Sequence, residues 1–150
     1  MHILFVESAY PNLKGEQGGA GTYVRNVGLE LIKRGHKVSV LRGGNHLIEH
    51  GFRIDQGIQV YSQKIKSNFA WYVCKTQVIN KLFFPLIQYL IVGLHKYIYI
   101  NKINNKDRID IIEYSSTGDF WQCIFKSIPY IVHLNGSGFS YKTYLGNKMS

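Results

Sequence analysis

The sequence contains little cysteine: Cys74 and Cys123 are its two cysteines, and they lie far apart in a chain of 150 residues. This spacing excludes a disulfide-rich scaffold and a C-x-x-C metal or redox pair. The first residues, Met1 to Glu7, have no basic segment ahead of their short apolar run, so they match a strand better than a secretory signal peptide. We therefore expect a cytoplasmic protein.

Acidic residues are scarce in the middle of the chain. None occurs between Asp55 and Asp107, although seven lysines lie in that interval, and the formal net charge of the chain is +9. A basic face of this kind suits nucleic acid, anionic lipid or phosphorylated ligands, and a solvated lysine-rich surface is the alternative. No basic-aromatic motif of a known nucleic-acid-binding module accompanies the charge, so we do not expect nucleic acid as a partner.

Short β-prone runs alternate with helical patterns along the chain. The helix expected after the first strand has Lys33 and Arg34 in its last turn, and Gly35 occupies the place of the left-handed residue that ends a helix. Runs typical of buried strands occupy residues 2–6, 37–41, 58–61, 109–113 and 130–134. This alternation predicts an α/β fold in a single domain over residues 1–150, with a Rossmann-like, doubly wound parallel sheet.

Residues 69–100 are apolar with a helical pattern and predict two helices that divide near Pro85, a residue suited to a first helical turn. The most apolar run, Leu82 to Leu94, is shorter than the ~20 residues that a membrane span needs, and basic residues flank it. A buried core helix is therefore expected. The alternative is a helix that lies in a membrane interface, because tyrosines and Trp71 occur among the lysines of this segment.

In a doubly wound sheet, ligands bind beyond the carboxyl ends of the strands, where the strand order reverses. Three segments follow such strand ends and are predicted to surround one crevice: 7–22, 114–119 and 133–138. The first segment holds Gly18, Gly19 and Gly21 just ahead of the expected helix. Backbone N–H groups at that helix end favour a phosphate or a polar sugar group, and a merely flexible glycine turn is the alternative.

The glycine segment does not match the Gly-x-Gly-x-x-Gly fingerprint of dinucleotide-binding folds. Gly19 and Gly21 supply its first pair, but Val24 occupies the third place. The second strand also ends at Leu41-Arg42, without the acidic residue that would bind a ribose. We therefore expect no nicotinamide cofactor.

Polar residues follow the later strands. His133 ends the fifth strand close to Asn135 and Gly136, where a histidine is either a donor, base or ligand in a site or a structural residue beneath the loop. Ser116 and Asp119 belong to a hydroxyl-rich edge after the fourth strand. They either hydrogen-bond a sugar or cap a short helix.

No motif predicts a metal site or a nucleophile paired with its base. His46 to His50 match the H-x-x-E-H pattern of some zinc peptidases, but glycines on both sides leave barely one helical turn. Glu113 stands alone near a strand end, so no pair of catalytic carboxylates is predicted either. We expect no bound metal.

Several motifs together resemble one enzyme family. In chain order they are Ile3-Leu4-Phe5-Val6, Tyr10-Pro11, Gly18-Gly19 with Thr22-Tyr23-Val24 and Asn26, Lys33-Arg34-Gly35-His36-Lys37-Val38, Asp110-Ile111-Ile112-Glu113 and Pro129-Tyr130-Ile131-Val132. This set is similar to the opening of the family-4 glycosyltransferases, whose GT-B architecture consists of two facing Rossmann-like domains. The resemblance covers nearly the whole chain and implies that it is the N-terminal, acceptor-side half of such an enzyme.

The resemblance implies retaining transfer of a sugar from a nucleotide-sugar donor to a glycan or lipid-linked acceptor, in polysaccharide or glycolipid synthesis. No metal and no cofactor other than the nucleotide-sugar co-substrate is implied. The substrate-binding residues that follow from it are Gly18, Gly19, Thr22, Ser116, Asp119, Asn135 and Gly136. An acceptor on a lipid carrier would suit contact of residues 69–100 with the inner face of a membrane.

Two departures from the family pattern bear on catalysis. The histidine that often precedes the glycine after the fifth strand is Asn135 here, and His133 lies two residues earlier, so these two are the catalytic candidates. The Glu-x7-Glu motif of the donor domain is absent. We therefore expect the isolated chain to be inactive, with its donor-binding half in a longer polypeptide, lost from a truncated gene or supplied by a partner chain. A non-catalytic ligand- or anion-binding domain is the alternative function.

Overall fold

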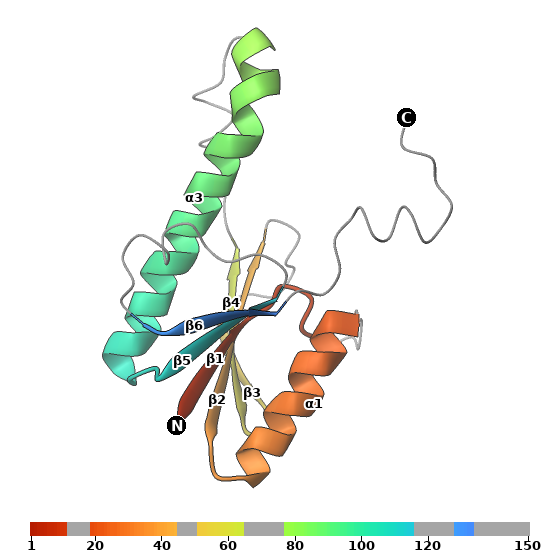
Figure 1. Ribbon diagram of the computed structural model, residues 1–150, viewed down its shortest axis with the longest axis vertical. Helices are drawn as coiled ribbons and strands as arrows, with labels where there is room; N and C mark the ends of the chain where they lie inside the picture. The colour runs from red at the N-terminus through yellow and green to blue at the C-terminus, as the bar shows by residue number, and fades with distance from the viewer. Residues whose placement is uncertain (12–18, 45–50, 65–76, 116–127, 134–150) are drawn as a thin grey trace.

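The computed structural model describes residues 1–11, 19–44, 51–64, 77–115 and 128–133. These residues form one sheet with helices on its two faces (Figure 1). In chain order the elements are β1 (His2–Val6), α1 (Gly19–Lys33), β2 (Lys37–Gly44), β3 (Gly51–Asp55), β4 (Ile58–Lys64), α3 (Gln77–Lys106), β5 (Ile111–Ser115) and β6 (Tyr130–His133).

The sheet has six strands in the order β3-β4-β2-β1-β5-β6. β1 pairs in parallel with β2 and β5, β2 pairs in parallel with β4, and β5 pairs in parallel with β6, whereas β3 is antiparallel to β4. When the parallel strands alone are numbered along the chain, their order is 3-2-1-4-5, as in Rossmann-like folds. The predicted fold class, an α/β protein with a doubly wound and mostly parallel sheet, is confirmed.

The two faces of the sheet bury different residues because side chains alternate along each strand. Toward α1, the buried apolar residues are Phe5, Tyr10, Val24, Val38, Val40, Ile58 and Val60. Toward α3, they are Leu4, Val6, Leu41, Ile100, Ile103, Ile109, Ile112, Tyr114 and Ile128. Burial on both faces explains the nearly continuous apolar runs that predicted the central strands.

The C-terminal end of α1 has the predicted cap. Gly35 has a φ of 81°, which is the left-handed conformation that glycine adopts without strain. The His36 N–H donates to the Leu31 carbonyl (3.0 Å) and the Gly35 N–H donates to the Ile32 carbonyl (2.9 Å). This pair of bonds is a Schellman motif, and it satisfies the last carbonyls of the helix before the chain enters β2.

Three strands differ from their predicted bounds. β2 and β4 both run longer, because residues 43–44 pair with residues 63–64 instead of ending the strand. β5 begins at Ile111 rather than Ile109, since the Ile109 N–H donates to Asn104 Oδ1 (2.8 Å) and so belongs to the turn after α3. The partner available at each position, rather than the local sequence, decides where these strands begin and end.

The strand β3 was not predicted. It forms a hairpin with β4 through a two-residue turn at Gln56 and Gly57, whose φ values are 49° and 93°. Positive φ at both central positions defines the type I′ turn that suits the twist of paired strands. The alternation of Phe52 and Ile54 ahead of Gln56-Gly57 was the available signal, but both apolar side chains lie more than half exposed on this edge strand.

The predicted division of the long helical segment near Pro85 is wrong. α3 is one helix of 30 residues that continues from Gln77 through Pro85 to Lys106. A proline removes one backbone hydrogen bond, and the bonds of the flanking turns keep the helix continuous. The second half of α3 covers one face of the sheet and its first half extends beyond the sheet (Figure 1). Residues 69–76 and the predicted cap at 116–119 lie outside the described residues.

Within the described part of the chain, no helix is both long enough and apolar enough to cross a membrane.

Candidate functional site

The strand order reverses at β1, since the chain moves from β1 to β2 on one side and adds β5 on the other. Ligands of this class of sheet bind beyond the carboxyl ends of the strands at that point. The segment after β1 and the first turn of α1 lie at this edge, as do the last residues of β5 and β6 (Figure 1). The candidate site is therefore built from these segments.

The first turn of α1 lies against the segment that follows β1. A Cβ atom added to Gly21 would lie 2.7 Å from the Ala9 carbonyl carbon and closer still to its oxygen. A non-bonded contact this short is not possible, so the helix reaches this position because residue 21 is a glycine. The backbone contact fixes the start of α1 beside the end of β1.

Glu7 holds the turn after β1 in place. Its side chain is buried, and its Oε1 atom accepts a hydrogen bond of 2.6 Å from the Ala9 N–H. Its own N–H donates to the Leu41 carbonyl at 3.1 Å, which continues the pairing of β1 with β2 by one residue. A buried carboxylate with backbone partners is a structural group, and we assign Glu7 no role in binding.

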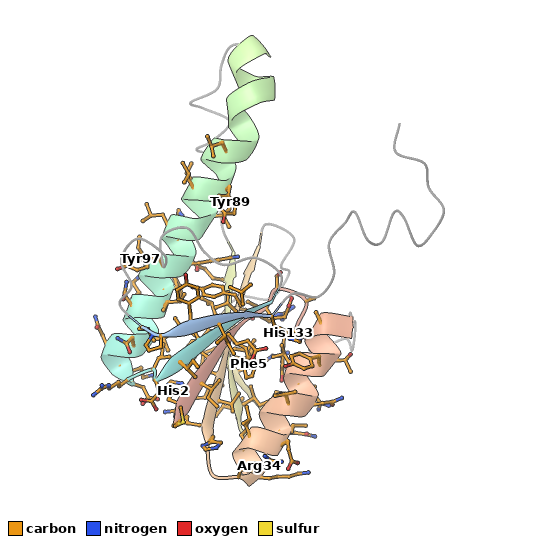
Figure 2. All side chains as sticks on the ribbon, in the orientation of Figure 1. His2, Phe5, Arg34, Tyr89, Tyr97 and His133 are labelled. Atoms are coloured by element: carbon orange, nitrogen blue, oxygen red, sulfur yellow. The ribbon has the colours of Figure 1, made fainter. Side chains whose placement is uncertain are left out.

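Three side chains from three elements meet at the carboxyl edge: Tyr23 of α1, Glu113 of β5 and His133 of β6 (the Glu113 cluster). The Tyr23 hydroxyl donates to Glu113 Oε1 at 3.4 Å, and His133 Nδ1 lies 3.5 Å from the same oxygen. The Tyr23 and His133 rings contact edge to face with centroids 4.6 Å apart. Figure 2 shows His133 at the end of β6, beside the start of α1.

The Glu113 carboxylate governs the electrostatics of this cluster. Burial, then the Glu113 charge and its hydrogen bond, raise the pKa of the Tyr23 hydroxyl, so this group stays a neutral donor. His133 Nδ1 is buried and makes no hydrogen bond to the described residues, while the His133 side chain as a whole is 39% exposed. A carboxylate, an imidazole and a phenol together provide donors and acceptors for a hydroxyl-rich ligand.

The structure places some of the predicted site residues at this edge. Gly19 is the exposed first residue of α1 and Thr22 lies in its first turn, while His133 ends β6. His133 and the first turn of α1 come together through Tyr23. The other predicted substrate-binding and catalytic positions lie outside the described residues: Gly18, Ser116, Asp119, Asn135 and Gly136.

Sequence reasoning missed Tyr23 and the role of Glu113. The sequence predicted only that Glu113 has no second carboxylate beside it. It did not predict that Glu113 faces His133, which it does because both side chains lie on the same face of the paired strands β5 and β6. Tyr23 lies 90 residues from Glu113 in the chain. The polar Glu113 between the buried Ile112 and Tyr114 was the one available signal, since it marks the opposite face of the strand.

A second group of side chains, Tyr10, Arg25 and Asp55 (the Asp55 cluster), anchors the segment after β1. The Tyr10 ring is 1% exposed, and its hydroxyl donates to Asp55 Oδ2 at 2.8 Å. The Arg25 Nε atom donates to the same oxygen at 3.2 Å, and Arg53 donates to the Pro11 carbonyl. These bonds tie the segment to α1 and to the β3–β4 hairpin.

Charge stabilises the ionised form of Asp55. Burial alone would raise the pKa of this carboxyl, but the hydrogen bonds from Tyr10 and Arg25 and the charges of Arg25 and Arg53 outweigh it and lower the pKa. Near the carboxyl-terminal end of α3, the hydrogen bond from Lys37 likewise lowers the pKa of Asp107. Both aspartates are therefore more acidic in the folded protein than in the unfolded chain.

Stability should consequently fall in acid. A carboxyl whose pKa is lowered by folding contributes stability above the unfolded pKa of about 3.9, and this contribution is lost as the pH falls through the folded pKa. We expect the free energy of unfolding in urea to decrease between about pH 5 and about pH 3. The Asp55→Asn variant should show a shallower decrease, because one of the two groups no longer titrates. An unchanged slope in this variant would show that Asp55 is not held as described.

A cavity of about 400 Å³ lies at the opposite edge of the sheet, where β5 and β6 begin. Its lining residues are Asn104, Arg108, Ile109, Asp110, Ile128 and Pro129. Parallel sheets of this class bind ligands at the carboxyl edge, so this cavity is not the predicted crevice. We assign the candidate site to the carboxyl edge and its Glu113 cluster.

The fold and this edge define a Rossmann-like α/β domain with a polar cluster at its strand-order reversal. In the described part of the chain, no three His, Cys, Asp or Glu side chains come together in a way that would hold a metal ion. The H-x-x-E-H segment at residues 46–50 lies outside it. Neither a protein-family model nor a curated protein sequence matches the chain.

Proposed function

We propose that the chain is the acceptor-side, N-terminal domain of a GT-B glycosyltransferase of family 4. The reaction is retaining transfer of a sugar from a nucleotide-sugar to a glycan or lipid-linked acceptor. The observation that carries the proposal is the Glu113 cluster at the strand-order reversal, beside the first turn of α1. A hydroxyl-binding group and an end of a helix that favours phosphate then lie within one site.

The start of α1 suits the phosphate side of a nucleotide-sugar. Gly19 is exposed, and no atom lies within 4 Å of the position that a Cβ would take there. The N–H groups at the start of a helix and the helix dipole attract negative charge. No acidic side chain occupies this first turn, so nothing in α1 itself opposes an approaching phosphate.

The Glu113 cluster suits the sugar side. The Glu113 carboxylate accepts hydrogen bonds from hydroxyl groups, while the Tyr23 hydroxyl and the His133 ring supply a donor and a second exchangeable group. Glu113 also positions the His133 ring, whose Nδ1 faces it at 3.5 Å. In this proposal the three side chains bind and orient hydroxyl groups of the acceptor or of the transferred sugar. The donor-binding half comes from further residues of the same polypeptide or from a partner chain.

The test is a matched pair of substitutions at Gly19, assayed in the protein that contains the donor-binding half. Gly19→Ala should fold normally and keep its transfer activity, because the added methyl group meets no atom. Gly19→Asp should also fold but lose transfer activity on the order of tenfold or more, because a carboxylate then faces the donor phosphates. Transfer of a labelled sugar from the nucleotide-sugar to the acceptor is the measurement.

Two results would contradict this proposal in different ways. A folded Gly19→Asp variant with unchanged transfer activity would show that the donor phosphates do not bind at the start of α1. If the wild-type chain together with its donor-binding half transferred no sugar, the proposed enzymatic activity would be wrong. A non-catalytic binding domain would then be the better description.

A further inference from the structure

The outer surface of α3 carries a row of apolar residues that ends in lysines. Residues four apart are turned by only about 40° around a helix, so Leu90, Leu94, Ile98, Lys102 and Lys106 form a stripe within one half of its circumference (the α3 row). Leu94 and Ile98 are 37% and 44% exposed, and both lysines are exposed. The opposite side of the helix supplies Ile100 and Ile103, which are buried in the core. The helix is therefore apolar on two sides, and its packing accounts for one of them.

Aromatic and basic side chains flank the α3 row. Tyr97 and Tyr99 lie on either side of Ile98, whereas Tyr89, 47% exposed, lies on the part of α3 that extends beyond the sheet, on the other side of the helix from Ile98 (Figure 2). The Lys102 ammonium lies 5.2 Å from the centre of the Tyr99 ring, and the Lys106 ammonium lies 5.9 Å from that of Phe52. Tyrosine has an apolar ring and a polar hydroxyl, so it prefers the boundary between water and lipid.

We propose that the α3 row docks on an anionic lipid surface. Apolar side chains enter the boundary between headgroups and acyl chains, and the lysines attract the negative headgroups. The charge of the surrounding segment is complementary to such a surface, since seven lysines and no acidic residue occur between Asp55 and Asp107. Few apolar side chains take part, so attraction to the headgroups is needed as well, and binding should be reversible.

The same charge argues against the two other occupants. A second copy of this chain seated on the α3 row would bring two lysine-rich, acid-free segments together, and like charges repel. Nucleic acid would satisfy the lysines but offers no partner for a row of leucine and isoleucine. The inference concerns α3 alone and does not depend on the proposed sugar transfer.

The experiment is flotation of the whole chain with lipid vesicles in a density gradient. One set of vesicles is phosphatidylcholine alone, and in the other about a third of the lipid is phosphatidylglycerol. We expect the chain to float with the anionic vesicles at low salt, to float much less with the neutral ones, and to be released by high salt. A folded chain that floats with neither set, or equally with both, would overturn the proposal.

Two variants and a matched control assign the binding to the α3 row. Leu94→Glu with Ile98→Glu should lower the vesicle partition on the order of tenfold or more, because two apolar contacts are lost. Ile54→Glu is the control, because Ile54 is 65% exposed on β3, outside α3, and should not change binding. Equal binding by the α3 variant and the control would overturn the proposal. Circular dichroism melting establishes that each variant is folded.

A second variant tests the charge without changing the apolar residues. Lys102→Gln with Lys106→Gln should lower partition into the anionic vesicles by at least about tenfold, because two positive charges near the headgroups are lost. The weak partition into neutral vesicles should stay unchanged. An unchanged preference for anionic vesicles would contradict the role of these lysines. Light scattering in the absence of lipid measures whether a second copy of the chain binds the α3 row instead. If the wild-type chain were a dimer and the Leu94→Glu with Ile98→Glu variant a monomer, the proposal would be overturned.

Discussion

Gly21→Ala is expected to lower the free energy of unfolding by at least about 3 kcal/mol, because overpacking against a rigid neighbour exceeds the usual cost of an added methyl group. The added Cβ would overlap the carbonyl group of Ala9 and lie 3.0 Å from Tyr10 Cα. These are backbone atoms, so no rotation of a side chain relieves the contact. Either α1 must move away from β1, or the segment after β1 must leave its place. The urea midpoint of the purified chain measures the loss.

Gly28→Ala is the matched control because it makes the same change in the same helix. Its added Cβ would lie 3.0 Å from Ile58 Cδ1 and 3.3 Å from Val38 Cγ1, both of them side-chain atoms. Ile58 can rotate, and alanine gains up to about 1 kcal/mol over glycine inside a helix. We expect the net change to stay within about 1 kcal/mol. If the two alanine variants unfolded at the same urea concentration, the close approach of α1 to Ala9 would be wrong.

Asp55→Ala is expected to lower the free energy of unfolding by about 2–3 kcal/mol, because it leaves a buried hydroxyl without an acceptor and removes a charged hydrogen bond. The hydroxyl belongs to Tyr10, whose side chain is 1% exposed. Arg25 loses the same oxygen. The segment after β1 loses one of its attachments to the β3–β4 hairpin, and this segment leads into the candidate site. Chemical unfolding and the proteolysis rate of the segment measure the effect.

Glu30→Ala provides the comparison. The Glu30 carboxylate pairs with Arg34 at 3.3 Å and with Lys33 at 3.5 Å, but all three side chains are more than half exposed. Exposed pairs of this kind contribute less than about 0.5 kcal/mol. A loss as large as that of Asp55→Ala would show that burial is not what distinguishes the two carboxylates. If both variants lowered the free energy of unfolding by the same small amount, the Tyr10 hydroxyl would have found another acceptor in Asp55→Ala.

The order of elements could be predicted from the sequence because it depends on local patterns. Apolar runs such as residues 3–6 predict buried strands, and Gly35 after Lys33-Arg34 predicts the end of α1. Alternation of strands with helices then restricts the sheet to parallel, right-handed connections. The position of the site at the carboxyl edge follows from that topology. Charge also needs only the sequence: the acid-free interval from residue 56 to residue 106 is visible without a fold.

The composition of the site could not be predicted in the same way, because it depends on contacts between distant residues. Glu113 meets His133 through the register of β5 against β6, and Tyr23 reaches them from α1. A shift of one residue in that register would turn Glu113 to the other face of the sheet. No pattern within a single segment specifies this register.

The same distinction separates what the sequence determined from what only the tertiary structure decided. The α/β class, the cap at Gly35 and the basic middle of the chain are local properties, and the sequence determined them. The unbroken α3, the edge strand β3 and the exposure of the α3 row depend on which surfaces other elements cover. Burial is a property of the assembled layers. An apolar helix is therefore predictable from the sequence, but which of its sides remains exposed is decided only when the helix packs on the sheet.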